Sequence, residues 1–392
     1  MCQFKSLCEE YFASAVSTTT DIVYFRAIDY PKLLACQTNT LSDEYLIKSN
    51  VKDDLLLYIL TGFPLSAASS WYQNLTEGRQ RSILAKYEEW KKRWYPNSSF
   101  DDILQNLAPS ADSFVTKCTI RDKPVPCVSG FGLMSQLGLC TAIIILNPSE
   151  QTLPGLRGSL DIYLKHANTS AIKNVLPSTN LGWSIIIGQS LPGNWGLMNL
   201  HPINFPISSR VCMAITVKQT KLVNSAKRPC EEMFTHSYDF NGVSFSFPNT
   251  MERCIHDCEA QHQMAQCGCE AVGHSFSTIK RNVCEPGNMT LCIQDSFHSL
   301  NCNKCLLPCR YVSHDLEMTI NKQHRSNFGA DTVMTVFYKT FAVKRSEQIF
   351  SQSVSGMLAK LGGQANLWLG MKASTVIQFM FYMILAISAR HN

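Results

Sequence analysis

The spacing of hydrophobic residues changes several times along the chain, and each change predicts a different kind of element. Residues 41–117 are predicted to be mainly helical, because apolar side chains recur there at intervals of three and four positions. They fall into three segments, namely Leu55, Leu56, Leu57 and Leu60, then Ile83, Leu84, Tyr87 and Trp90, and then Phe100, Ile103, Leu104 and Leu107. Pro96 and Pro109 follow the second and third segments and predict their ends.

Strands are predicted on both sides of this helical region. Ile22–Phe25 and Leu33–Cys36 precede it, and from Cys118 to Thr220 short apolar runs alternate with turn signals. Within that stretch Leu139–Leu146 is too short to cross a membrane as a helix and is predicted as a buried strand. Val333–Phe341 is predicted to be a further strand. The pattern therefore predicts a mixed α+β chain.

One segment near the C-terminus is long and apolar enough to suggest a membrane span. Leu367–Ser388 has 22 residues and is interrupted by Lys372 and Gln378. As a helix it would be about 33 Å long, which matches the thickness of a bilayer. Residues 1–20 carry Lys5, Glu9 and other polar side chains and lack the apolar core of a signal peptide.

Composition and net charge indicate which class of protein this chain belongs to. The chain is 45% hydrophobic and 17% charged, as is typical of a folded protein, and its net charge of +5 is spread thinly. Lys91, Lys92 and Arg93 form the densest basic cluster, beside Trp90 and Trp94. We interpret this cluster as a solvated helix face, and we expect no nucleic-acid partner.

The cysteines point to an oxidising compartment. Fifteen of the 17 lie between Cys36 and Cys309, which indicates either disulfides or metal sites. Sequons at Asn74, Asn97, Asn168 and Asn288 predict glycosylation in the secretory pathway and favour disulfides. A zinc site is the alternative, because His256, His262 and His274 lie near these cysteines. The C-x-C spacing of Cys267 and Cys269 disfavours zinc, since it holds two thiols too close together for easy tetrahedral coordination.

Several motifs resemble the degenerin and epithelial sodium channel family, also called amiloride-sensitive sodium channels. Tyr30–Asn39 resembles that family's F-P-A-V-T-x-C-N-x-N strand, and Gly138–Asn147 more loosely resembles its G-x-C-Y-T-F-N strand. The block Cys230–Cys309 resembles the family's cysteine-rich thumb, and Leu306–Cys309 its C-L-P-P-C element. Leu361–Gly370 resembles the L-G-G-Q-x-G-L-F-L-G run that opens the second transmembrane helix.

The resemblance implies a fold and a domain plan. We expect a disulfide-rich extracellular domain, with palm and β-ball sheets and a helical finger and thumb, followed by a C-terminal transmembrane helix. The plan has residues 1–20 as a remnant of a cytoplasmic N-terminus, 21–350 as the extracellular domain, 351–388 as the pore-lining helix and 389–392 as a cytoplasmic tail. Within the extracellular domain, 41–117 would be finger-like, 118–229 palm and β-ball, 230–309 thumb-like and 310–350 a return to the palm.

The resemblance also implies seven disulfides. The pairs are Cys36 with Cys140, Cys118 with Cys127, Cys230 with Cys309, Cys254 with Cys305, Cys258 with Cys302, Cys267 with Cys292, and Cys269 with Cys284. Cys2, Cys8 and Cys212 are left over, and the family places the first two in the reducing cytosol.

The pore assignments come from the same resemblance. Gly370, Met371 and Lys372 would form the selectivity filter and Ala359 the pore mouth, while Gly362 and Gly363 would allow close helix packing. Lys372 stands where the family has serine, Gln378 stands where it has an acidic residue, and Asn366 replaces a glycine. Three ammonium groups about 7 Å apart would repel by about 2 kcal/mol per pair, so we expect a homotrimer to conduct cations poorly.

The family's first transmembrane helix is not evident in this sequence. We expect about 30 to 40 residues, a spanning helix and its flanks, to be missing between Cys8 and Ile22, as in an incomplete gene model. The alternative is an extracellular N-terminus.

The function implied is that of a plasma-membrane sodium channel subunit. It would conduct Na⁺ in a homo- or heterotrimer with related subunits, in contact with membrane lipid, either constitutively or gated by an extracellular peptide or proton. The alternative is a non-conducting, single-pass accessory subunit or receptor-like binding ectodomain. We expect no cofactor and no metal, and no enzymatic activity, because the chain has neither a G-x-S-x-G elbow nor an H-E-x-x-H helix.

Overall fold

The computed structural model forms two compact units. One contains residues 21–220 and 231–345, and the other contains 1–20, 221–230 and 346–392. The residues described are 16–38, 41–63, 68–110, 113–135, 138–145, 150–167, 170–176, 182–188, 196–197, 202–225, 229–231, 235–240, 243–248, 251–272, 282–293, 301–322, 329–350, 355–356, 359–360, 362–363, 375 and 377–383.

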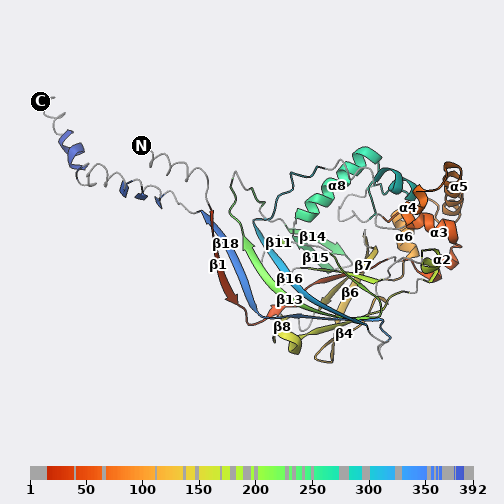
Figure 1. Ribbon diagram of the computed structural model, residues 1–392, viewed down its shortest axis with the longest axis horizontal. Coiled ribbons are helices and arrows are strands. Elements are labelled where there is room, and N and C mark those ends of the chain that lie inside the picture. Colours follow the sequence, from red (N-terminus) through yellow and green to blue (C-terminus); the bar gives the residue numbers. More distant parts are fainter. Residues whose placement is uncertain are drawn as a thin grey trace. The chain divides into compact units, whose positions relative to one another are not determined.

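Helices dominate the first part of the larger unit, as the apolar spacing predicts. They are α2 (Asp43–Lys48), α3 (Asp53–Leu60), α4 (Ala68–Gln73), α5 (Glu77–Trp94) and α6 (Phe100–Leu107), and Figure 1 shows them gathered together. A reciprocal capping box starts α6: Asp102 N donates to Ser99 Oγ at 3.2 Å, and Ser99 N donates to Asp102 Oδ2 at 3.1 Å.

Strands predominate after α6, and with strands from the start of the chain they form two main sheets. The nine-stranded sheet has the order β1-β18-β13-β17-β9-β4-β5, with β16 pairing β13 and β11. Its strands are β1 (Val16–Tyr24), β4 (Val115–Ile120), β5 (Lys123–Val125), β9 (Leu160–Leu164), β11 (Gly196–Leu197), β13 (Ser209–Lys221), β16 (Arg310–Lys322), β17 (Thr332–Tyr338) and β18 (Ala342–Phe350). The five-stranded sheet has the order β12-β10-β3-β7-β6. Its strands are β3 (Leu33–Gln37), β6 (Cys127–Ser135), β7 (Gly138–Ile145), β10 (Gly182–Ile187) and β12 (Ile203–Pro206).

Short elements complete the described part of the chain. Two small antiparallel pairs are β2 (Ile28–Asp29) with β8 (Glu150–Gln151), and β14 (Thr235–Phe240) with β15 (Val243–Pro248). The remaining helical pieces are η2 (Gly155–Gly158), α7 (Ser170–Val175), α8 (Met251–Cys267), α9 (Pro286–Asn288) and the π-helical turn η3 (Met289–Ile293).

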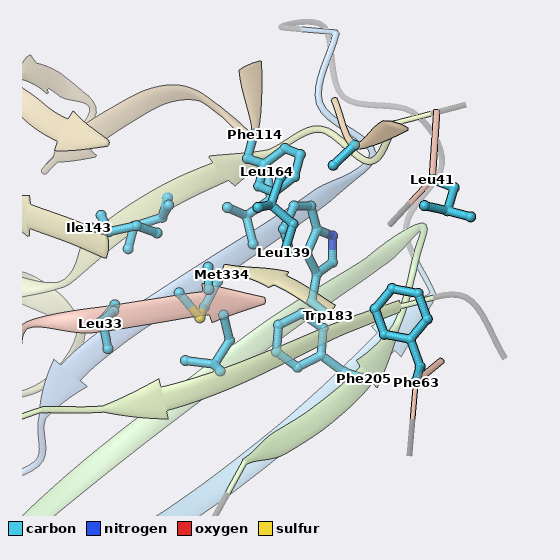
Figure 2. Packing of buried hydrophobic residues seen from close by; sticks show 14 of the residues in the cluster. Leu33, Leu41, Phe63, Phe114, Leu139, Ile143, Leu164, Trp183, Phe205 and Met334 are labelled. Carbon is cyan, nitrogen blue, oxygen red and sulfur yellow. The ribbon is translucent and has the colours of Figure 1, made fainter. Parts of the chain in front are cut away.

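The core of the larger unit contains side chains from both main sheets. Leu33 of β3 and Trp183 of β10 belong to the same buried cluster as Leu164 of β9 and Met334 of β17, and Figure 2 shows these side chains together. The Trp183 ring is fully buried and meets Phe114 edge-on, with ring centroids 5.5 Å apart. Burial of large aromatic and aliphatic groups therefore holds the sheets together.

Three strand predictions shift in detail. β1 begins at Val16 rather than Ile22, because the run Val16–Thr20 is rich in β-branched residues that favour extended backbone. The strand predicted as Leu139–Leu146 is β7, which starts at Gly138, and its described part ends at Ile145. The strand predicted as Val333–Phe341 is β17, which ends at Tyr338.

The disulfides join the elements in the predicted pairs. Six bonds are described: Cys36–Cys140, Cys118–Cys127, Cys254–Cys305, Cys258–Cys302, Cys267–Cys292 and Cys269–Cys284. Cys230 and Cys309 are also disulfide-bonded, whereas Cys212 is a free thiol. Cys36 and Cys140 face each other directly on β3 and β7. The fold is thus a disulfide-rich mixed α/β domain.

In the smaller unit, strand ends are tied together at Glu347 of β18. Its backbone oxygen accepts a hydrogen bond from Thr19 Oγ1 of β1 at 3.2 Å, and its carboxylate pairs with Lys221 at the end of β13. Beyond β18, the described residues 355–356, 359–360, 362–363, 375 and 377–383 are helical. Among the helices that the structure describes, none combines the length and hydrophobicity that a membrane crossing needs.

Candidate functional site

The predicted pore segment is only partly described. Gly370, Met371 and Lys372 lie outside the described residues. Ala359, Gly362 and Gly363 are helical and exposed, and a Cβ added at either glycine would meet no atom within 4 Å. The glycines therefore leave room for a close neighbour without having one in this single chain.

The described part of the predicted span exposes mainly apolar side chains, together with the polar residues Thr375 and Gln378. Residues 377–383 form a helical stretch, and every large hydrophobic side chain in it is at least half exposed, from Met383 at 50% to Tyr382 at 71%. Large apolar side chains exposed together in this way are uncommon on the surface of a water-soluble protein.

A second site was not anticipated from the sequence: a contact between the helices of the region predicted to be finger-like and the cysteine-rich block predicted to be thumb-like, which we call the finger–thumb junction. It consists of Tyr58, Tyr72, Tyr87 and Lys91 from α3, α4 and α5, and Glu285 and Gly287 from the segment before and within α9. All of these residues belong to the larger unit.

Tyrosines form the finger side of the junction. The ring centroid of Tyr58 lies 5.2 Å from that of Tyr72 and 5.1 Å from that of Tyr87. The three side chains are almost fully buried, with exposed fractions of 1%, 4% and 0%. Burial raises the pKa of each hydroxyl, so all three stay protonated at physiological pH. They are therefore fixed, neutral hydrogen-bonding groups.

A single carboxylate on the thumb side meets these groups. Tyr87 Oη donates to Glu285 Oε2 at 2.5 Å, and Lys91 Nζ donates to Glu285 Oε1. The side chains of Lys91 and Glu285 are only 21% and 33% exposed. Partial desolvation strengthens this ion pair relative to the exposed pairs on the same helix, such as Arg93 with Glu89.

Backbone contacts extend the junction along α9 and η3. The Gly287 N–H donates to Tyr58 Oη at 3.1 Å, and a Cβ at position 287 would lie 2.8 Å from that oxygen, so only glycine allows this approach. Gln73 Nε2 donates to the Thr290 carbonyl at 3.4 Å.

Disulfides fasten the thumb side of the junction to α8. Cys284 precedes Glu285 and is bonded to Cys269, and Cys292 lies in η3 and is bonded to Cys267, the last residue of α8. The segment 284–292 is therefore bonded near both of its ends to the C-terminal end of α8 and the residues just beyond it.

Lys91 corrects the sequence interpretation. Lys92 and Arg93 are exposed as predicted, but Lys91 is directed toward Glu285. Asp101 is also poorly solvated, because its Oδ1 is buried and has no hydrogen-bond partner among the described residues. Its neighbour Asp102 completes the capping box at the start of α6.

The remaining predicted residues give no further site. Asn74, Asn97 and Asn288 are exposed, and Asn168 lies outside the described residues. Within the described ranges, no group of three or more histidine, cysteine, aspartate or glutamate side chains could hold a metal ion.

Comparisons with known proteins agree with the sequence motifs. The family model described as "Amiloride-sensitive sodium channel" matches residues 1–382. The Drosophila melanogaster protein "Sodium channel protein Nach" is 21% identical over 154 residues, an alignment that covers 35% of this chain and only 28% of that protein. A solved structure of a proton-activated chloride channel covers 97% of this chain and 92% of its own, with 8% identity and a TM-score of 0.33, from which nothing about this chain follows.

Proposed function

Because this chain belongs to the amiloride-sensitive sodium channel family, we propose that it is a subunit of a trimeric, amiloride-sensitive channel that carries Na⁺ across the plasma membrane. The family match over residues 1–382 carries this proposal, since it includes both the cysteine-rich domain and the pore-like segment. Proteins of this family are membrane channels with a large extracellular domain, not enzymes.

Two features of the chain support a place in a membrane. The helical residues 377–383 expose six large apolar side chains, which lipid or neighbouring pore helices would cover. The run Leu361–Gly370, which precedes them in the sequence, contains small residues that let helices approach closely. In the proposed trimer, Gly370, Met371 and Lys372 line the constriction.

The finger–thumb junction supports a route for gating. An extracellular ligand that moves the thumb-like block would displace Glu285, and the buried contacts of Tyr87 and Lys91 would carry that displacement into α5. Glu347, which bonds to Thr19 of β1 and Lys221 of β13, lies in β18, the last strand before the predicted pore segment in the sequence. We assign these two groups of contacts to the transmission of gating.

A non-conducting accessory subunit is the second candidate. The observation that favours it is Lys372, together with Gln378, because a ring of ammonium groups repels cations and the acidic residue that would attract them is absent. In a heterotrimer whose other subunits have serine at this position, the pore would contain fewer ammonium groups. Such a channel could conduct Na⁺ even though this chain alone conducts poorly.

Electrical recording from cells that express the chain tests the proposal. We expect an inward Na⁺ current that amiloride blocks, either with the chain alone or with related subunits of the family. A chain that reaches the cell surface and neither carries nor alters such a current would exclude the channel function and the accessory function together. A chain that only alters the current of other subunits would support the second candidate.

A further inference from the structure

The C-terminal ends of α2 and α5 meet at one hydrogen bond. The indole N–H of Trp90, near the end of α5, donates to the carbonyl oxygen of Ser49 at 2.8 Å, and Ser49 directly follows α2. Exposed residues of both helices lie within about one helical turn of this bond. We call their surface the basic–aromatic patch, which consists of Ile47, Lys48, Lys86, Arg93 and Trp94.

Helical periodicity places the α5 residues of the patch on the side of the helix that meets α2. Lys86, Arg93 and Trp94 are three or four positions from Trp90, so they share its side of α5. Lys92 is only two positions from Trp90 and therefore lies on the opposite side of the helix. The patch thus includes only part of the basic cluster in the sequence.

Two large apolar side chains of the patch are open to solvent and are accompanied by positive charge. Ile47 is 74% exposed and Trp94 43% exposed. Arg93 pairs with Glu89 at 3.1 Å, but both side chains are largely exposed, so this pair is weak. Lys48 and Lys86 take part in no ion pair that the structure describes. The patch therefore combines uncovered apolar area with excess positive charge.

Local structure explains the charges of the patch but not its apolar residues. Lys48 and Arg93 lie in the last turns of their helices, where a cation interacts favourably with the helix dipole. Exposure of Trp94 gives the isolated chain no such benefit. The surroundings of Trp94 are ordered, because the rings of Trp90 and Tyr95 lie 5.3 Å apart and Tyr95 N donates to the Lys91 carbonyl at 2.8 Å. A partner would therefore meet a preformed surface, which lowers the entropic cost of binding.

We propose that the basic–aromatic patch binds an acidic segment of a partner protein that also carries a large apolar side chain. Carboxylates of that segment pair with Lys48 and Lys86, and its apolar side chain packs on Trp94 and Ile47. An apolar centre with a polar rim is the usual arrangement of a protein interface, and tryptophan and arginine are enriched among its strongest contacts. A sulfated polysaccharide would satisfy the cations alone and leave Ile47 and Trp94 uncovered.

Binding of synthetic polymers to the purified full chain tests this proposal. The probe is a fluorescently labelled, glutamate-rich random copolymer of glutamate and tyrosine, and polyglutamate of equal length and heparin are the comparisons. Fluorescence anisotropy at physiological ionic strength should show that the copolymer binds about tenfold more tightly than either comparison, because only the copolymer supplies both carboxylates and apolar side chains.

Variants of the chain locate the binding site of the copolymer. Trp94→Ser should weaken copolymer binding about tenfold. Leu84→Ser is its matched control, because Leu84 is 40% exposed on the same helix but about 15 Å from Trp94 along the axis, and its affinity should stay unchanged. Lys48→Gln with Lys86→Gln should weaken binding and reduce its salt dependence, whereas Lys92→Gln on the opposite side should do neither.

Several results would overturn the proposal. These are absence of copolymer binding, equal affinity for the copolymer and for polyglutamate or heparin, and equal effects of Trp94→Ser and Leu84→Ser. The proposal does not depend on ion conduction. A chain that binds the copolymer through this patch but neither carries nor alters a current would support the patch and contradict the proposed function, and the reverse result would contradict the patch alone.

Discussion

Lys91 and Lys92 are neighbours on α5 with the same side chain, but only Lys91 lies at the finger–thumb junction. Lys91 pairs with the partly buried Glu285, and Lys92 is exposed. We expect Lys91→Met to lower the free energy of unfolding by about 1–2 kcal/mol, because Glu285 loses its counter-charge in a partly desolvated place. Thermal or denaturant unfolding of the purified chain measures this.

Lys92→Met is the matched control for that variant. Its side chain is solvated, so the change should stay within about 0.5 kcal/mol. Equal effects of the two substitutions would show that the ion pair at the junction contributes nothing beyond ordinary surface charge.

Asp101 and Asp102 form a second pair of neighbours with opposite expected effects. Burial, and then the charge of Asp102, raise the pKa of Asp101 above 3.8. The native state therefore disfavours the charged Asp101, which costs stability at neutral pH, and the cost disappears as the pH falls through the raised pKa toward 3.8. Asp101→Asn should stabilise the chain at pH 7 and have progressively less effect in acid.

Asp102→Asn should instead destabilise the chain at neutral pH, by about 1 kcal/mol, because it weakens the capping box with Ser99. Melting temperatures of both variants measured as a function of pH provide the check. A destabilising Asp101→Asn at pH 7 would show that the Asp101 carboxylate has a stabilising partner.

At the scale of elements, the stapled segment 284–292 is the part of the junction that is open to the sharpest test. Cys269→Ser with Cys284→Ser removes a bond that closes a loop of 15 positions, and should cost about 3 kcal/mol. The same variant should raise amide hydrogen exchange in η3 and in the part of α5 around Lys91, because the staple no longer holds Glu285 in place.

A control disulfide of similar loop size lies away from the junction. Cys118→Ser with Cys127→Ser opens a loop of 9 positions and should cost nearly as much stability. Its effect on exchange should be confined to β4 and β6. If both double variants loosened α5 equally, the link between α8 and the finger helices would be global stability rather than the staple.

The helices and several strands could be predicted because their signals are local. The three- and four-residue spacing of Ile83, Tyr87 and Trp90 defines the buried face of α5, and all three are buried. The buried strand β7 is apolar along most of its length, and turn signals bound it. Such patterns depend only on neighbouring residues.

The finger–thumb junction could not be predicted in the same way. Glu285 is 194 positions from Lys91, and the residue pattern around either of them does not predict a contact with the other. A basic residue in the last turn of an amphipathic helix is usually solvated, so the local pattern predicted a solvent-exposed Lys91 rather than one paired with Glu285. The disulfide pairs were available in advance only because the cysteine spacing resembles a known family, which supplies long-range pairing that local patterns lack.

At the scale of the whole molecule, the proposed channel subunit combines a disulfide-rich extracellular domain with an apolar pore segment that contains one charged residue, Lys372. Lys360, Gly362 and Gly363 precede the filter positions, and Lys372 occupies the position at which the family has serine. If Lys372 lines the ion path, its charge raises the barrier for Na⁺ by about 2 kcal/mol, which corresponds to more than a tenfold change in rate.

The most direct measurement is therefore the whole-cell Na⁺ current of Lys372→Ser compared with that of the native chain, at equal surface expression. We expect a more than tenfold larger inward current that amiloride blocks and that disappears when a large organic cation replaces extracellular Na⁺. Lys360→Ser, which changes a lysine before the filter, should leave the current unchanged. Absent or equal currents from the native chain and Lys372→Ser would contradict a place for this residue in a sodium pore.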